Sequence, residues 1–499
     1  MKKQKFLLIC LYDFESYGVR CLSANLMKND ISYTVLFFQN LDFNNLRLPE
    51  EDDWLALKKF ILEHDAEYIG LSLRSPVFKI AKEMTQRIRQ YYNGKIVWGG
   101  AHPTIEPDEC LEFADAVFTG EGENSLVQFL QNDFGTPIEG VSYKGDNHHN
   151  IVLVNNLDSL PPPLYENSHC YHQIADVIDE GDPLIKGDYM EKYGESYTYE
   201  TMTSRGCPFN CTYCSSPIVS KRKVRIRNVD KVIDEILDMK KIMRIERICF
   251  IDEVFGLNMD WLKEFTTKYR EKIHIPFTAE IHPNMITQER IDLYKSAGMI
   301  GVELGIQSGS EDFRKNVLNR DIKQQVIYDG INLLVKSGIT VTIDIIIDNP
   351  YETEKDLKAS FDLINTIPRC VGVKVFSLSL LPKTVLTERL LNEGLIQRNQ
   401  VEQYACKTHH MWRARIDTHR EPWRRFWSNM IIIASLRNLS AGQNWLATPT
   451  NIDENSGHIH IFSNEDLDRM AHDKLYRDNP ALLEEIIFSN IHESQRKYI

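Results

Sequence analysis

Short apolar runs, separated by amphipathic stretches, occupy most of the first 146 residues. The runs are rich in β-branched and aromatic residues, and helical spacing is clear over residues 78–92. Five such runs are present, at residues 6–11, 33–38, 68–73, 95–100 and 116–120. Strands that alternate with helices predict a parallel sheet covered by helices. We therefore expect a Rossmann-like (flavodoxin-like) α/β domain over residues 1–146, with its ligands at the carboxyl ends of the strands.

This alternation stops at residues 147–196 and resumes at residue 197. Pro161, Pro162 and Pro163 follow one another, and proline fits neither a helix interior nor a central strand. The surrounding stretch is polar and shows little periodicity. Residues 147–196 are therefore predicted to link two domains.

Six further apolar runs, most of them followed by helical spacing, fill residues 197–385. They lie at residues 197–203, 247–251, 277–281, 301–306, 341–347 and 373–378. This rhythm predicts a partial (β/α)6 barrel of the TIM type, whose chemistry would lie at the C-terminal ends of the strands. Residues 386–499 show helical spacing over 386–395, 423–439 and 480–491, and are predicted to form a C-terminal helical domain.

Composition and charge narrow the classes of function. The chain has 499 residues and a net charge of -13, which disfavours a nucleic acid as the main partner. No run approaches the roughly 18 apolar residues of a membrane span. The first apolar run is also too short for a signal peptide. Apart from one group of three, the 10 cysteines are scattered singly. That pattern suits a reducing compartment, and a cytoplasmic location is expected.

The group of three is Cys207, Cys211 and Cys214, in a C-x3-C-x2-C pattern. Three thiolates so close in sequence can reach one soft metal centre. Structural zinc sites and iron–sulfur clusters usually take four protein ligands, and no further Cys or His lies within ten residues. A [4Fe–4S] cluster held by three cysteines would leave one iron open to a small molecule. The alternative is a set of buried or incidental cysteines.

This cysteine spacing, at the end of the first predicted barrel strand, resembles that of the radical S-adenosylmethionine (SAM) superfamily. The resemblance implies that SAM binds at the open iron and is cleaved to a 5′-deoxyadenosyl radical. It also implies SAM contacts from polar or aromatic residues near the strand ends. These are Tyr213, Asp252, Glu253, Glu303, Gln307 and Ser308. Individually, such carboxylates can instead cap a helix or pair with an arginine.

The first domain resembles the cobalamin-binding domains found beside such barrels. Asp13 to Gly18 occupy the frame of a D-x-H-x-x-G loop, with Glu15 in place of the histidine. Ser72 precedes Gly99 and Gly100 at the family's serine-to-diglycine spacing. The resemblance implies cobalamin bound without a histidine below the cobalt. It implies contacts from Asp13, Glu15, Gly18, Ser72, Arg74, Gly99, Gly100, His102, Gly120 and Glu121. The alternative is a flavodoxin-like domain without this cofactor.

Together these resemblances imply a cobalamin-dependent radical SAM enzyme with a [4Fe–4S] cluster. The expected reaction is methylation, through methylcobalamin, of an unactivated carbon in a small-molecule substrate. A non-methylating oxidation, cyclisation or rearrangement with the same cofactors stays open, and so does a non-catalytic sensor. An external electron donor of the flavodoxin or ferredoxin type is the expected protein partner. No catalytic side chain is assigned from the sequence.

Overall fold

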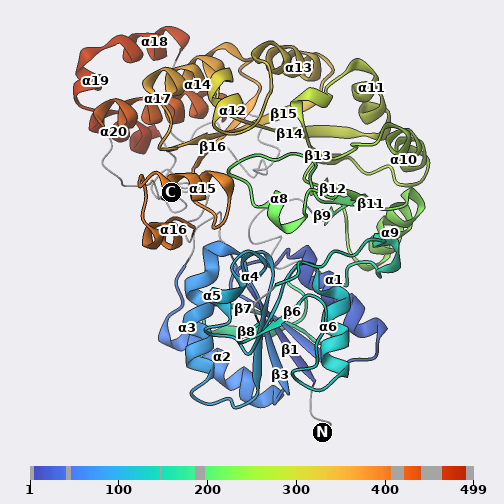
Figure 1. Cartoon of the computed structure of the whole chain (residues 1–499). Coiled ribbons are helices and arrows are strands. Elements are labelled where there is room, and N and C mark those ends of the chain that lie inside the picture. The colour runs from blue at the N-terminus through green and yellow to red at the C-terminus, as the bar shows by residue number, and fades with distance from the viewer. Residues whose placement is uncertain are drawn as a thin grey trace.

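The computed structural model describes residues 5–40, 47–146, 149–185, 197–405, 421–439 and 463–490. Two sheets dominate it, one in each half of the molecule (Figure 1). The N-terminal half lies below the barrel half in this view, and the last helices pack on the far side of the barrel. Among the described residues, no helix is long and apolar enough to cross a membrane.

The first sheet has eight strands in the order β6-β5-β4-β3-β1-β2-β7-β8. They are β1 (Phe6–Leu11), β2 (Tyr33–Phe38), β3 (Tyr68–Ser72), β4 (Lys95–Gly99), β5 (Ala116–Phe118), β6 (Val141–Tyr143), β7 (Cys170–Ile174) and β8 (Val177–Glu180). The inner strands are parallel, and the two edge strands are antiparallel to their neighbours. The five predicted strands are therefore confirmed. The sheet also continues into the stretch for which the sequence predicted a link.

Alternate residues of each strand face opposite layers of helices. Leu7, Ile9 and Leu11 pack with α2 (Glu51–His64) and α3 (Phe78–Ile88). The residues between them, together with Phe6, pack with α1 (Tyr17–Lys28) and α6 (Gly122–Gln131) on the other face (Figure 1). This doubly covered sheet leaves its carboxyl edge, rather than a face, open for ligands.

The second sheet has six parallel strands in the order β16-β15-β14-β13-β12-β9. The strands are β9 (Thr198–Thr201), β12 (Arg247–Phe250), β13 (Phe277–Ile281), β14 (Met299–Gln307), β15 (Thr340–Ile347) and β16 (Gly372–Ser377). The connecting helices are α9 (Val229–Ile242), α10 (Met259–Lys272), α11 (Gln288–Ala297), α12 (Glu311–Asn316), α13 (Gln324–Lys336) and α14 (Glu354–Thr366). Since β9 and β16 are the two edges, the barrel is partial, as predicted.

The C-terminal helices complete the barrel core. They are α15 (Val385–Asn392), α16 (Arg398–Ala405), α17 (Pro422–Leu439), α18 (Asn464–His472), α19 (Lys474–Asp478) and α20 (Ala481–Asn490). Helix α17 packs on α14 and β16. It buries Phe426, Trp427, Met430 and Ile431 in the same hydrophobic cluster as the barrel strands. The predicted helical extension is therefore confirmed where it is described. The rest of residues 386–499 lies outside the described residues.

A buried ion pair ties the predicted linker to the first domain. Arg20 on α1 pairs with Asp182, and both side chains are almost fully buried. The Arg20 guanidinium also donates to the Phe14 carbonyl at 2.8 Å and lies over the Tyr165 ring. Asp182 in turn accepts the Leu184 N–H at 2.9 Å.

We predict that Asp182→Ala destabilises the protein by roughly 3–5 kcal/mol, because it leaves the Arg20 charge buried and unpaired. Chemical denaturation followed by circular dichroism measures this change. Glu63→Ala is the matched control, because its partner Lys59 and Glu63 itself are exposed, and it should cost less than about 1 kcal/mol. Equal effects of the two variants would contradict the argument.

Candidate functional site at the facing edges of the two sheets

The three cysteines lie on a loop that follows β9 at the carboxyl end of the barrel sheet. The loop leaves from β10 (Ser204–Arg205), which pairs with β11 (Arg225–Ile226), and it ends in α8 (Ser216–Val219). Gly206 has a φ of 93°, and a Cβ there would lie 2.2 Å from the Lys223 carbonyl oxygen. Glycine alone avoids that clash. The hairpin therefore fixes the point at which the cysteine loop begins.

The loop is held from two further sides. Thr212 donates its N–H to the Leu318 carbonyl at 3.0 Å and its hydroxyl to the Val317 carbonyl at 2.7 Å. Phe209 stacks on His282, with the ring centroids 4.0 Å apart. Burial lowers the pKa of His282 to about 3, so this imidazole is neutral at physiological pH. The loop is thus fixed before any ligand binds.

Arg320 is the cation nearest to the sulfur atoms, and the sequence did not single it out. Its Nη1 donates to Cys211 Sγ at 3.5 Å, and its Nη2 donates to the Gly305 carbonyl at 2.5 Å. Burial raises the pKa of the Cys214 thiol to about 11, so a bound metal must displace protons from this site. A guanidinium here offsets the charge of metal-bound thiolates and can also pair with a carboxylate of a ligand.

The two acidic residues after β12 have different positions. Asp252 is fully buried, and its carboxylate accepts hydrogen bonds from Thr203 N (2.9 Å), Thr203 Oγ1 (2.6 Å) and Ser204 Oγ (2.6 Å). Glu253 accepts from Gly206 N at 3.1 Å and from Ser216 Oγ at 3.4 Å. Asp252 therefore holds the segment that leads into the cysteine loop, whereas Glu253 lies beside the loop itself.

The other residues predicted to contact SAM lie at different positions in the barrel. Tyr213 packs against a small core that contains Leu380 and Leu386. Gln307 has a φ of 73°, and its side chain fills the space that a Cβ at Gly305 would need. Ser308 is fully buried, and its hydroxyl accepts the N–H of the nearby Ser310. Roles in SAM binding stay predictions for all of them.

Glu303 lies in the barrel interior and is paired with Lys374 at 2.7 Å. Desolvation by the surrounding protein, and then the charge of Glu303, raise the pKa of Glu280 to about 7, although the residue keeps an exposed surface. Burial and the same neighbour raise the pKa of Asp344 well above its usual value. Glu280 and Asp344 are therefore protonated more readily than ordinary carboxyls.

In the first domain, the backbone of the diglycine lies close to the end of the neighbouring strand. Ser72 and Gly99 are register partners on adjacent strands. Gly100 has a φ of 110°, and a Cβ there would lie 2.5 Å from the Leu73 carbonyl oxygen. His102, on α4 (Ala101–Ile105), is buried, and its Nδ1 lies 3.0 Å from Ser75 Oγ. Within the described chain its Nε2 has no hydrogen-bond partner.

The loop after β1 contributes charge to the same edge. Asp13 pairs with Arg74 at 3.5 Å, across the ends of β1 and β3. Glu15 is exposed on this loop and Gly18 is exposed in the first turn of α1, where a Cβ would have nothing within 4 Å. The predicted cobalamin residues from Asp13 to His102 thus lie on neighbouring strand ends, as the doubly wound topology requires. Their contacts with the cofactor stay predictions.

Gly120 and Glu121, also predicted for cobalamin, make contacts within the protein. A Cβ on Gly120 would lie 2.2 Å from the Val152 carbonyl oxygen. Glu121 pairs with Arg225 at 2.5 Å and with Arg205 at 3.5 Å. Arg205 also pairs with Glu123 at 2.7 Å. Because both arginines belong to the hairpin beside the cysteine loop, these carboxylates join the two domains.

The two candidate cofactor edges therefore face each other. Helix α4, which follows the diglycine, packs against α8, which follows the third cysteine. Figure 1 shows both helices where the two halves of the molecule meet. A ligand at the edge of the first sheet and a ligand at the cysteines would share this region.

Comparison with known proteins identifies both halves. Residues 10–130 match the model of the B12-binding domain, and residues 201–364 match that of the radical SAM superfamily. The chain is a cobalamin-binding radical SAM protein. Its fold is shared with OxsB, a cobalamin-dependent SAM radical enzyme (TM-score 0.64, 16% identity, 87% of this chain and 69% of that one). It is also shared with the methyltransferase TsrM of Kitasatospora setae (TM-score 0.61, 16% identity, 78% and 76%).

Several curated proteins are similar to this chain at 24–27% sequence identity. An uncharacterized methyltransferase of Pyrococcus horikoshii is 27% identical over 63% of this chain and 67% of its own length. Cytidylyl-2-hydroxyethylphosphonate methyltransferase of Streptomyces wedmorensis is 24% identical over 53% and 55%. The hopanoid C-3 methylase of Methylococcus capsulatus is 24% identical over 52% and 48%. These matches thus span between about half and two thirds of each relative's own length.

The cofactors of this family are a [4Fe–4S] cluster, SAM and cobalamin. The donor set fits the cluster, since three thiols of one fixed loop are available to three different irons. In the described part of the chain, no group of three or more His, Cys, Asp or Glu is placed to hold a single metal ion. The diglycine edge fits cobalamin, since its backbone admits close approach and His102 offers a buried nitrogen without a partner.

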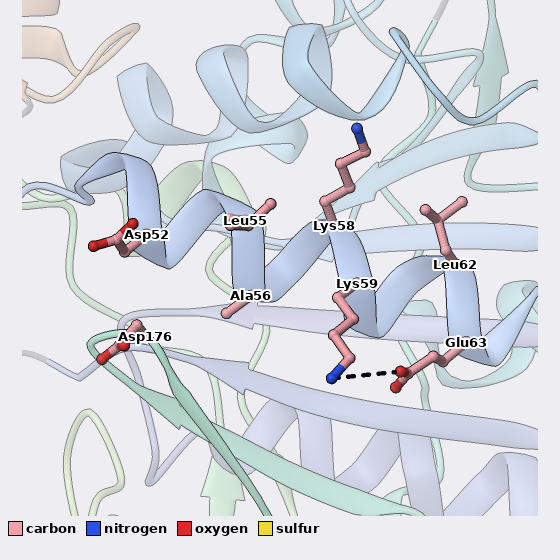
Figure 2. A pocket seen from close by; sticks show the side chains of 8 residues that line it. All are labelled: Asp52, Leu55, Ala56, Lys58, Lys59, Leu62, Glu63 and Asp176. Atoms are coloured by element: carbon pink, nitrogen blue, oxygen red, sulfur yellow. Dashed lines mark ion pairs between the residues drawn. The ribbon is translucent and has the colours of Figure 1, made fainter.

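A separate hollow lies on the solvent side of α2 (Figure 2). Leu55 and Leu62 are exposed there, and Asp176 of the β7–β8 turn lies across from them. Lys59 and Glu63 at its rim form an exposed ion pair. No cysteine, histidine or glycine lines this hollow. The candidate site is therefore at the cysteine loop.

We predict that Cys211→Ala loses the visible absorbance and most of the iron of the anaerobically reconstituted protein. The variant removes a thiolate ligand that Arg320 and the fixed loop position for the cluster. Iron analysis and absorbance spectroscopy measure both quantities. Cys370→Ala is the control, because Cys370 precedes β16 at the opposite end of the barrel and should leave both unchanged. Full cluster content in Cys211→Ala would refute the assignment.

A buried carboxyl at the end of β15 makes stability depend on pH. Glu352 is 1% exposed and its Oε2 accepts the Asn349 N–H at 2.9 Å. In the described part of the chain its Oε1 has no hydrogen-bond partner. Burial raises the pKa of Glu352 to about 8, whereas an unfolded glutamate titrates near about 4.3. The folded state therefore holds an extra proton between these two values.

Stability should consequently fall as pH rises from about 5 to 8, by at most about 1.4 kcal/mol per pH unit from this group. We predict that Glu352→Gln flattens this slope, because its amide does not ionise. Denaturant titrations at several pH values measure the slope. Glu63→Gln, at an exposed position, serves as the control and should keep the native slope. An unchanged slope in Glu352→Gln would exclude Glu352 as its source.

Proposed function

We propose that this protein is a cobalamin-dependent radical SAM C-methyltransferase that acts on an unactivated carbon of a small molecule. The observation that carries the proposal is the packing of α4 against α8. This contact brings the cobalamin edge and the cysteine loop to one region, as direct transfer between two cofactors and a substrate requires. Methyltransferases among the proteins similar to this chain support the same reaction class.

When bound, the cluster and SAM would supply a hydrogen-abstracting radical, and cobalamin would supply the methyl group. The side chains around the cysteine loop would bind and orient these groups. Arg320 offers a guanidinium next to Cys211, where it can hold a ligand carboxylate. Glu253 offers carboxylate oxygens on the other side of the loop, where they can accept from an ammonium group. Phe209, stacked on neutral His282, excludes water from this side of the loop.

The carboxyls inside the barrel can move protons. Glu280 has a pKa raised to about 7, so either of its forms is available at neutral pH. The Glu303–Lys374 ion pair lies nearby, with 2.7 Å between Nζ and Oε2. A substrate that reaches into the barrel from the cysteine loop would therefore meet both a hydrogen-bond donor and an acceptor at Glu280.

Anaerobic reconstitution with iron, sulfide, cobalamin, SAM and dithionite tests this function. We expect 5′-deoxyadenosine from the complete protein and none from Cys211→Ala. With a methylated product, S-adenosylhomocysteine should form alongside it, because a second SAM restores the methyl group. Liquid chromatography with mass spectrometry measures these products. If the fully loaded protein yields no 5′-deoxyadenosine with any reductant, a sensor replaces the enzyme as the better explanation.

A cyclisation is the second candidate, and specific relatives favour it. Anaerobic magnesium-protoporphyrin IX monomethyl ester cyclases from Cereibacter sphaeroides and Rubrivivax gelatinosus are 23% and 24% identical to this chain over 61% and 66% of it. Such a reaction consumes the radical without a methyl donor. In the same assay it would give 5′-deoxyadenosine without S-adenosylhomocysteine, and cobalamin would stay unmethylated.

A further inference from the structure

A short basic turn follows α8, directly beyond the third cysteine. Lys221, Arg222 and Lys223 are consecutive and all three are exposed. Lys221 and Arg222 have φ values of 51° and 58°, in the left-handed region. Such a conformation is uncommon for residues other than glycine. Two in succession make a tight turn that presents these side chains on the surface.

The turn touches the start of the cysteine loop. The Lys223 carbonyl oxygen lies so close to Gly206 that a Cβ on Gly206 would be 2.2 Å away. Lys223 and the residues before it also close α8, which begins two residues after Cys214. The positive side chains are therefore attached to backbone that contacts both ends of the loop that would hold the cluster.

The charge of this turn is not neutralised within the described part of the chain. Some basic residues of the barrel have acidic partners: Lys268 pairs with Asp230 and Glu264, and Lys323 pairs with Glu311. Among the described residues, no ion pair involves Lys221, Arg222 or Lys223. These three positive charges lie on a chain whose net charge is -13. Three consecutive exposed positive charges on such an acidic chain favour an anionic partner.

We infer that this turn, Lys221 to Lys223, is the docking surface for an acidic one-electron carrier protein that reduces the cluster. The inference rests on the proposed radical SAM function. In the docked complex one electron leaves the reduced carrier and enters the cluster, so the carrier is oxidised by one electron and the cluster is reduced by one. Electron transfer weakens steeply with distance. A docking surface is therefore useful only where it adjoins the cluster loop, as this turn does.

An acidic protein fits the turn better than a nucleic acid does. The positive surface is confined to three residues, whereas a nucleic acid would meet the repulsion of a strongly acidic chain around it. The neighbouring arginines of β11 and of the segment after it are not available, because Arg225 pairs with Glu121 and Arg227 pairs with Glu235. Ile226 is 37% exposed beside them and offers a small apolar contact next to the charged turn.

The test combines a charge reversal with two sources of electrons. The variant Lys221→Glu, Arg222→Glu, Lys223→Glu is reconstituted as the full protein beside the native one. Each protein is assayed for 5′-deoxyadenosine with dithionite and, separately, with an acidic flavodoxin kept reduced by its reductase. The affinity for oxidised flavodoxin is measured by calorimetry at low and high salt. This binding measurement does not depend on turnover.

The charge-reversed protein should show at least ~10-fold weaker flavodoxin binding and a similar loss of flavodoxin-driven activity. Its dithionite-driven activity should stay native. Added salt should weaken binding of the native protein much more than that of the variant, because salt screens exposed charges. The control variant Lys240→Glu, Arg244→Glu, Lys241→Glu makes the same charge change at the end of α9, before β12 starts, and should retain native binding.

Native flavodoxin binding and rate in the charge-reversed protein would overturn the docking surface. Equal losses in the control variant would overturn it as well, because overall charge would then be the cause. Weakened RNA binding in the charge-reversed protein, with native flavodoxin kinetics, would assign the turn to a nucleic acid instead. Absence of 5′-deoxyadenosine from the native protein with dithionite would refute the proposed function rather than the docking surface.

Discussion

Arg205, two residues before the first cysteine, is one of two hairpin arginines that join the halves of this molecule. Arg205 lies 2.7 Å from Glu123 and 3.5 Å from Glu121, and all three side chains are largely buried. The two carboxylates begin α6 at the carboxyl edge of the first sheet, and the arginine ends β10. Removal of one partner from such a pair leaves a buried charge, which is costly. The domain contact and the position of the cysteine loop therefore depend on the same charges.

The charged groups around the site lie at different distances from the cysteine loop. Arg320 lies at the sulfur atoms, the neutral His282 stacks beneath the loop, and Glu253 lies beside it. Inside the barrel, desolvation and the charge of Glu303 raise the pKa values of Glu280 and Asp344, which favours their protonated forms. The cysteine loop thus has a cation at Arg320 and acceptor oxygens at Glu253. A zwitterionic ligand such as an amino acid fits this arrangement.

Local patterns predicted the elements well because strands and helices have fixed periods. The apolar runs of both sheets lie where the sequence predicted strands, and the cysteines follow the first barrel strand. The pattern gave no sign of β7 and β8, because Cys170 to Glu180 mix polar and apolar residues on the edge of a sheet. The helical spacing of α17 was visible in the sequence, but which barrel residues it covers depends on contacts between residues far apart in the chain.

For the site, the sequence alone determined the kind of chemistry. Three closely spaced cysteines indicate a metal cluster, and a diglycine after a strand indicates a ligand close to the backbone. Both signals depend on residue type and spacing, which are local features of the sequence. The tertiary structure decided which charges serve that chemistry. Arg320 reaches Cys211 across 109 positions of sequence, and Arg205 reaches Glu123 from another domain. It also placed Asp252 within the protein's own hydrogen bonds and Glu253 beside the loop. Ion pairs and burial arise between distant segments, so only the folded chain fixes them.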